Sequence, residues 1–149
     1  MAFIVDASVA AGWLLPDERT DIADALALRL KSEDAVAPDL FWHEARSLLV
    51  TALRRGRISE AGVYISLERL GTIPLRNAGP SDAVTVARLA IKHALSAYDA
   101  AYLDLALREH LPLGLDPTVV SPAAKLTINR EIRRNYRQSP SNRLPATLV

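Results

Sequence analysis

Short apolar segments alternate with longer amphipathic segments along the first 116 residues, and this alternation constrains the fold more than any other feature. Four of the apolar segments have the length and composition of buried strands. They lie at residues 2–5, 35–37, 72–75 and 112–115. Pro74 restricts the third of them to the edge of a sheet. Because strands that are separated by helices usually pair in parallel, the alternation predicts an α/β fold with helices covering a central parallel sheet.

The segments between these strands have the periodicity of helices. We expect helices at about 8–15, 18–31, 40–55, 59–70, 81–93 and 97–110. The helix over 40–55 has the clearest pattern, because one face carries its apolar residues, which are Phe41, Ala45, Leu48, Leu49, Ala52 and Leu53. Gly56 is a natural end for this helix, and Ser59 is a natural cap for the next one.

The chain has 149 residues, which is the size of one domain with a single core. It contains no cysteine, so disulfides, thiolate chemistry and cysteine-ligated zinc are excluded, and the cytoplasm is the expected compartment. The first residues lack the basic and apolar regions of a signal peptide. No apolar run approaches the roughly 20 residues that cross a bilayer, so we expect no association with a membrane.

Charge is distributed unevenly, although the net charge is only +1. Residues 1–116 contain 12 Lys or Arg and 16 Asp or Glu, whereas residues 117–149 contain 6 and 1. We therefore expect a domain over 1–116 and an atypical basic C-terminal segment over 117–149. This segment fits nucleic acid or an acidic partner, and it fits a solvated tail equally well. Arg54, Arg55 and Arg57 likewise fit either RNA phosphates or a solvated helix end.

Two aspartates stand where strands of a parallel sheet are expected to end. Asp6 follows the strand at 2–5, and Asp116 follows the strand at 112–115. Ligands of parallel α/β folds bind outside the carboxyl ends of the strands, so both aspartates are candidate metal ligands. Each has an ordinary alternative role, because aspartate also caps helices and forms turns.

Glu44 lies at the edge of the apolar stripe in the helix predicted over 40–55. A carboxylate in this place is partly removed from water, which is costly unless another group compensates its charge. A bound cation would compensate it, and so would Arg46 or Arg55. The position therefore indicates either a metal ligand or an ion pair.

Asp99 shares one helical face with the apolar side chains of Tyr102 and Leu103, whereas Asp104 is predicted to face solvent. Carboxylates that are buried close together repel one another and favour a divalent cation. Because the candidate ligands offer only oxygen, Mg²⁺ or Mn²⁺ suits them better than zinc. The spacing indicates an acidic metal site without showing that the acids converge.

Taken in order, these segments resemble the PIN-domain family, and within it the VapC-like toxins. Residues 4–9 (IVDASV) are similar to the strand-Asp-x-Ser start of the family, and residues 42–58 (WHEARSLLVTALRRGRI) are similar to the helix that carries its glutamate. The most specific match is residues 95–106 (LSAYDAAYLDLA), and residues 111–116 (LPLGLD) follow as the last acidic strand.

The resemblance implies a three-layer α/β/α PIN-like fold over residues 1–116. It implies an acidic, catalytic cluster that binds Mg²⁺ or Mn²⁺ and consists of Asp6, Glu44, Asp99 and Asp116. Ser8 and Ser96 match polar positions that support water or metal in such sites. The implied activity is endonucleolytic hydrolysis of RNA by a metal-activated water, as the toxin of a toxin–antitoxin pair. The implied partners are RNA, a cognate antitoxin protein and a second copy of the chain in a homodimer.

Two positions depart from the family pattern. Ser47 stands where asparagine is common, and residues 114–116 are one residue shorter than the usual approach to the last aspartate. The alternative is a catalytically impaired PIN-like scaffold that acts as a binding or interaction protein. Convergence of Asp116 with Asp6 and Asp99 would distinguish the enzyme from the scaffold.

Two other classes also place aspartate at strand ends. A phosphoryl-accepting signalling domain needs an acidic pair after the first strand, but Asp6 is followed by Ala7 and Ser8. A phosphatase of the haloacid-dehalogenase type needs Asp-x-Asp, and Ser8 occupies the second acidic position. Both classes are therefore less favoured than the ribonuclease.

Overall fold

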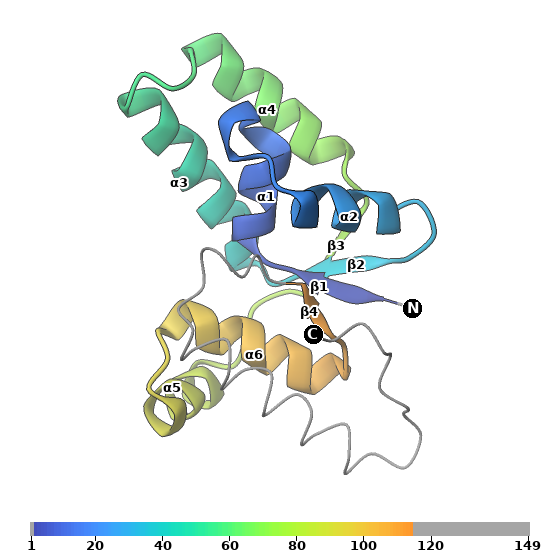
Figure 1. Ribbon diagram of the computed structural model, residues 1–149. Helices are drawn as coiled ribbons and strands as arrows, with labels where there is room; N and C mark the ends of the chain where they lie inside the picture. Colours follow the sequence, from blue (N-terminus) through green and yellow to red (C-terminus); the bar gives the residue numbers. More distant parts are fainter. Residues whose placement is uncertain (1, 115–149) are drawn as a thin grey trace.

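The computed structural model describes residues 2–114, in which strands and helices alternate as the sequence predicts (Figure 1). In chain order the elements are β1 (Phe3–Val5), α1 (Ala7–Leu14), the 3-10 helix η1 (Pro16–Glu18), α2 (Asp21–Arg29), β2 (Ala35–Ala37), α3 (Leu40–Arg54), α4 (Glu60–Thr72), β3 (Leu75–Asn77), α5 (Ala83–His93), α6 (Ala97–Glu109) and β4 (Leu113–Gly114).

The four strands form one parallel sheet in the order β3-β2-β1-β4. Phe3 of β1 is in register with Ala35 of β2, and Ile4 is in register with Leu113 of β4. The central strands β1 and β2 are buried along their whole length, which explains their uninterrupted apolar sequences. At the edge, β3 is partly exposed, in agreement with the restriction set by Pro74. Because the strands are parallel, their carboxyl ends meet at one edge of the sheet.

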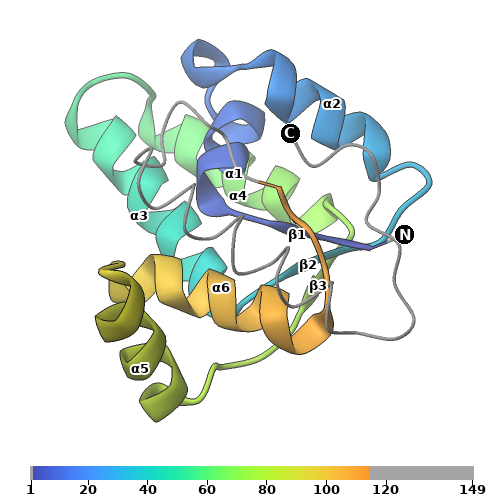
Figure 2. The same ribbon diagram turned by 60° about the horizontal axis from the view of Figure 1, so that its bottom comes forward.

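The helices form two layers, one on each face of the sheet (Figures 1 and 2). Successive side chains of a strand point to opposite faces of the sheet, so β1 contributes side chains to the two hydrophobic cores, one on each face. Phe3 and Val5 belong to the core under α1, α2, α3 and α4, whereas Ile4 joins Val36 and Leu113 in the core under α6. The outer helix α5 packs along α6. The predicted three-layer α/β/α fold with a central parallel sheet is confirmed.

Two elements, α2 and β3, begin three residues later than the sequence predicts. The helix predicted from residue 18 begins at Asp21, because Pro16–Glu18 form η1 and the Thr20 hydroxyl caps the helix that follows. The strand predicted at 72–75 is displaced to β3, because α4 continues further than its apolar pattern suggests.

Asp104 is buried, so the prediction that it faces solvent is wrong. Every residue from Ala100 to Ala106 is buried, which means that packing covers α6 around most of its circumference. Helical angle alone therefore does not identify an exposed face on this helix. One turn further on, Arg108 places its Nη1 3.9 Å from Asp104 Oδ2.

Within residues 2–114, no helix is both long and apolar enough to span a bilayer. The predicted domain boundary at residue 116 and the basic segment over 117–149 lie outside the described residues and stay predictions.

Candidate active site

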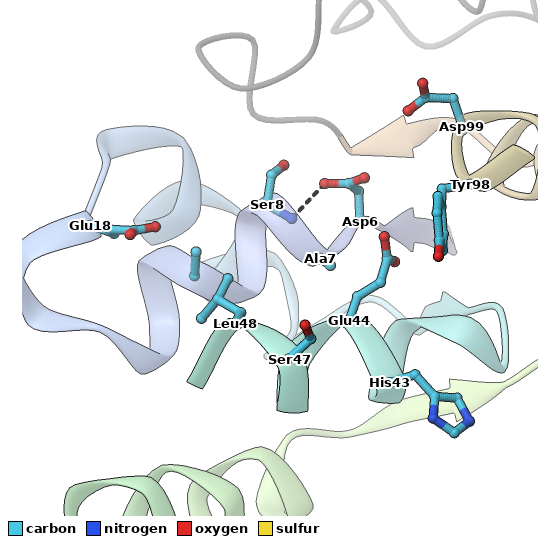
Figure 3. Close-up of a pocket in the computed structure, with 11 residues that line it drawn as sticks. Asp6, Ala7, Ser8, Glu18, His43, Glu44, Ser47, Leu48, Tyr98 and Asp99 are labelled. Carbon is cyan, nitrogen blue, oxygen red and sulfur yellow. Dashed lines mark hydrogen bonds between the residues drawn. The ribbon is translucent and has the colours of Figure 1, made fainter. Parts of the chain in front are cut away.

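A pocket of about 670 Å³ opens where β1 ends (Figure 3). Three of the four predicted acids line it, and each comes from a different element: Asp6 from the junction of β1 and α1, Glu44 from α3, and Asp99 from α6. The other described lining residues are Ala7, Ser8, Ala11, Glu18, His43, Ser47, Leu48 and Tyr98. The fourth predicted acid, Asp116, lies outside the described residues.

Asp6 follows β1 and caps α1. Its Oδ1 accepts a hydrogen bond of 2.6 Å from the backbone N–H of Ser8. The capping role considered as the alternative for Asp6 is therefore real, and it coexists with a place in the pocket. The support that Ser8 gives to Asp6 comes from its backbone N–H.

Glu44 lies on the second turn of α3 and points toward Asp6 (Figure 3). Its Oε2 accepts a hydrogen bond of 2.6 Å from the hydroxyl of Tyr102. Burial raises the pKa of Glu44 to about 7, and the Tyr102 hydrogen bond opposes this rise. The negative charges of Asp6 and Asp99 raise the pKa as well, so the three acids are close enough to repel one another.

Asp99 lies in the first turn of α6, where the positive end of the helix dipole favours a negative charge. Ser96 caps this helix and makes a reciprocal pair of hydrogen bonds with Asp99. The Ser96 hydroxyl donates to Asp99 Oδ2 at 2.7 Å, and its oxygen accepts from the Asp99 backbone N–H at 3.0 Å. This pair fixes the direction of the Asp99 carboxylate.

Glu44 has no arginine partner within residues 2–114. Of the two arginines considered, Arg46 lies beside His43, with 3.4 Å between Nη2 and Nδ1, and Arg55 ends α3 on an exposed turn. The described group that contacts the Glu44 carboxylate is the neutral hydroxyl of Tyr102. The alternative prediction, an ion pair between Glu44 and Arg46 or Arg55, is therefore wrong.

Two pocket residues escaped the sequence analysis. Glu18 lines the pocket and pairs with Arg57, with 2.6 Å between Oε1 and Nη2, while Arg57 also binds Asp17 at 2.8 Å. No local pattern reveals Glu18, because its partner comes from the loop after α3. Tyr98 lines the pocket with 63% of its surface exposed. The sequence could have indicated Tyr98, because Tyr98 precedes the candidate ligand Asp99 in the first turn of a predicted helix.

The donor set fits a hard divalent cation. The three acids offer only carboxylate oxygens, the ligands that Mg²⁺ and Mn²⁺ prefer, and a cation would relieve the repulsion that raises the pKa of Glu44. Among the described residues, no three acidic or histidine side chains already form the tight cluster of a completed metal site. Mg²⁺ commonly keeps several waters, so water molecules can bridge it to some of the carboxylates.

Comparison with known proteins identifies the family. The PIN domain family profile matches residues 3–114. A crystal structure of PAE2754 from Pyrobaculum aerophilum has a TM-score of 0.63 to this chain at 19% identity, over 93% of this chain and 91% of that chain, which shows a similar fold. No curated protein matches the sequence significantly. The chain therefore belongs to the PIN domain family, whose members are typically metal-dependent nucleases.

Proposed function

We propose that this protein is a divalent-metal-dependent endoribonuclease of the VapC-like kind, the toxin of a toxin–antitoxin pair. The observation that carries the proposal is that Asp6, Glu44 and Asp99 line one pocket at the carboxyl end of β1 in a PIN-domain chain. Within residues 2–114 the partner of the Glu44 carboxylate is the neutral hydroxyl of Tyr102, so a cation would compensate the charge of Glu44.

Asp6, Glu44 and Asp99 would hold Mg²⁺ or Mn²⁺, and Asp116 is the proposed fourth ligand. When bound, the ion supplies positive charge that attracts a phosphodiester and lowers the pKa of a water molecule. The chain's own residues position the ligands: the Ser8 N–H fixes Asp6, and the Ser96 hydroxyl fixes Asp99. Without a cation, three carboxylates repel an RNA phosphate, so we expect substrate binding to depend on metal.

Exposed side chains in the pocket and at the end of α3 also support a nucleic-acid substrate. The ring of Tyr98 is exposed in the pocket, and a nucleobase can stack on such a ring. Arg54 and Arg55 are exposed at the end of α3 and are available to phosphates. Arg57 is less available, because it is paired with Asp17 and Glu18.

The proposal extends to the partners of a VapC-like toxin. We expect a cytoplasmic homodimer whose activity a cognate antitoxin protein inhibits, and this part rests on the resemblance of the motifs alone. Expression in bacterial cells tests it: the wild-type chain should arrest growth, and Asp6→Asn should not. Unimpaired growth together with RNA cleavage in vitro would refute the toxin role and leave the nuclease intact.

Calorimetric titration with Mn²⁺, with RNA cleavage measured on the same samples, tests the active site. Asp6→Asn removes one charge and keeps the cap of α1, because asparagine caps helices as well as aspartate does. Asp82→Asn is the matched control, because Asp82 caps α5 through the Thr85 N–H outside the pocket. We expect the control to bind and cleave like the wild type, and Asp6→Asn to lose both.

Each other result has a clear meaning. Metal binding without cleavage in the wild type would favour the catalytically impaired PIN-like scaffold that acts as a binding protein. Absence of both binding and cleavage in the wild type would refute the metal-dependent nuclease.

A further inference from the structure

A buried tyrosine hydroxyl lies behind the acidic pocket. Tyr102 of α6 is only 2% exposed, and its ring packs in the core between the sheet and α6. Its hydroxyl donates the hydrogen bond of 2.6 Å to Oε2 of Glu44 on α3. This hydrogen bond joins α6, which carries Asp99, to α3, which carries Glu44.

The packing of the core does not require this hydroxyl. A phenylalanine ring would fill the same volume, and the chain uses phenylalanine at the fully buried positions Phe3 and Phe41. A buried hydroxyl costs free energy unless it is hydrogen-bonded, so its partner indicates what it does. The side-chain partner of Tyr102 is a carboxylate that lines the acidic pocket.

Glu44 depends on this contact more than the other two acids depend on theirs. Asp6 and Asp99 have short side chains, and each is held by a residue of its own helix terminus. The longer side chain of Glu44 has three rotatable bonds, and the hydrogen bond that holds it comes from a distant part of the sequence, since Tyr102 lies on α6. With Oε2 held, Oε1 accepts no hydrogen bond from the described residues.

We propose that Tyr102 is a positioning residue that holds Glu44 in the orientation in which its carboxylate binds the divalent cation. The inference rests on the proposed function, because it concerns the same metal site. Groups that hydrogen-bond to metal ligands fix the orientation of those ligands, and their loss typically weakens metal affinity by about 10- to 100-fold. Tyr102 itself does not contact the ion.

Tyr102→Phe tests the proposal, because it removes the hydroxyl and keeps the ring. Tyr64→Phe is the matched control: the Tyr64 hydroxyl also binds a carboxylate, Glu60 at 3.1 Å, but on the exposed surface of α4. We expect calorimetry to show Mn²⁺ affinity about tenfold weaker in Tyr102→Phe and unchanged in Tyr64→Phe. Equal Mn²⁺ affinity in Tyr102→Phe and the wild type would overturn the proposal.

A spectroscopic signal separates positioning from a general loss of stability. In protein labelled with ¹³C at the tyrosine Cζ atoms, Mg²⁺ should shift the signal that Tyr102→Phe removes, because the ion draws charge from the carboxylate to which Tyr102 donates. The same signal should not respond to Mg²⁺ in Glu44→Gln. A Tyr102 signal that ignores Mg²⁺ in a wild-type protein that binds the ion would also overturn the proposal.

The crystal structure of metal-free Tyr102→Phe decides the matter independently of the proposed function. If the wild type binds no Mn²⁺, the metal-dependent nuclease is refuted, but the position of Glu44 still tests Tyr102. A Glu44 side chain that turns away from the pocket in the variant supports positioning. A Glu44 side chain that keeps its orientation refutes it.

Discussion

The burial of the Glu44 carboxylate, together with the nearby charges of Asp6 and Asp99, predicts that Glu44→Gln stabilises the metal-free protein. Glutamine has nearly the same shape as glutamate, and its amide oxygen can still accept the hydrogen bond from Tyr102. The substitution removes the charge that burial and the charges of Asp6 and Asp99 disfavour. It should also weaken metal binding, because a neutral amide is a poorer ligand for Mg²⁺ than a carboxylate.

The size and the pH dependence of this effect follow from the pKa of Glu44. The folded protein raises this pKa from 4.5 to about 7, so folding favours the protonated carboxyl group. The Glu44 carboxyl group therefore lowers the free energy of unfolding. This reduction is complete above pH 7, becomes smaller between pH 7 and 4.5, and is absent below pH 4.5. At about 1.4 kcal/mol per pKa unit the full effect is roughly 3.5 kcal/mol. Because Glu44 is only half-buried, solvent screening reduces the expected stabilisation to about 1.5 kcal/mol.

Urea denaturation in EDTA measures the effect, with unfolding followed by the fluorescence of Trp13 and Trp42, which pack against the core. At pH 8.5, Glu44→Gln should unfold with a free energy about 1.5 kcal/mol higher than the wild type, and the difference should vanish near pH 4.5. Glu60→Gln is the control, because the same change there removes an exposed carboxylate that accepts a tyrosine hydrogen bond. Equal or lower stability of Glu44→Gln at pH 8.5 would refute the reasoning.

Three further changes test other parts of the site, and Ser59→Ala, at a helix cap outside the pocket, is the control for one of them. Asp99→Asn should abolish most Mn²⁺ binding and RNA cleavage while circular dichroism shows an intact fold, because asparagine can still accept the Ser96 hydrogen bond; full activity would eliminate Asp99 as a ligand. Ser96→Ala and Ser59→Ala should each lower the free energy of unfolding by about 1 kcal/mol through loss of a helix cap. Only Ser96→Ala should also weaken Mn²⁺ binding in calorimetry. Tyr98→Ala should weaken binding of single-stranded RNA by about 1–3 kcal/mol in fluorescence titration, with unchanged Mn²⁺ affinity.

Local patterns predicted the fold well because each element carries its own signal. Strands buried on both faces have uninterrupted apolar sequences, and Pro74 marked the edge strand. The predicted helix boundaries were wrong where two local preferences compete. At residues 16–18 the chain forms the 3-10 helix η1, which Pro16 starts, and α2 begins only after it. The predicted exposure of Asp104 was wrong for a different reason. Burial depends on which neighbouring elements cover a helix, and the position of a residue around the helix axis does not reveal this.

The same distinction applies to the site. Asp6 was predictable from its place at the end of a strand, and Glu44 and Asp99 were predictable as acids on apolar helical faces. The contact between Tyr102 and Glu44 was not, because it joins residues of two separate helices, and Tyr102 looked like an ordinary apolar neighbour of Asp99. The pairing of Glu18 with Arg57 is non-local in the same way. Sequence patterns therefore predicted the acids that line the pocket and missed the groups that hydrogen-bond to them.

The position of the pocket makes its geometry depend on both helical layers. Glu44 belongs to the layer of α1 to α4, whereas Asp99 and Tyr102 belong to α6 on the opposite face of the sheet. The Tyr102 hydrogen bond crosses between these layers at the carboxyl end of β1. A substitution that shifts α6 against the sheet would therefore move Asp99 away from Glu44 without touching either carboxylate. Such a substitution should weaken metal affinity more than its effect on stability alone would suggest, since metal ligands tolerate little displacement.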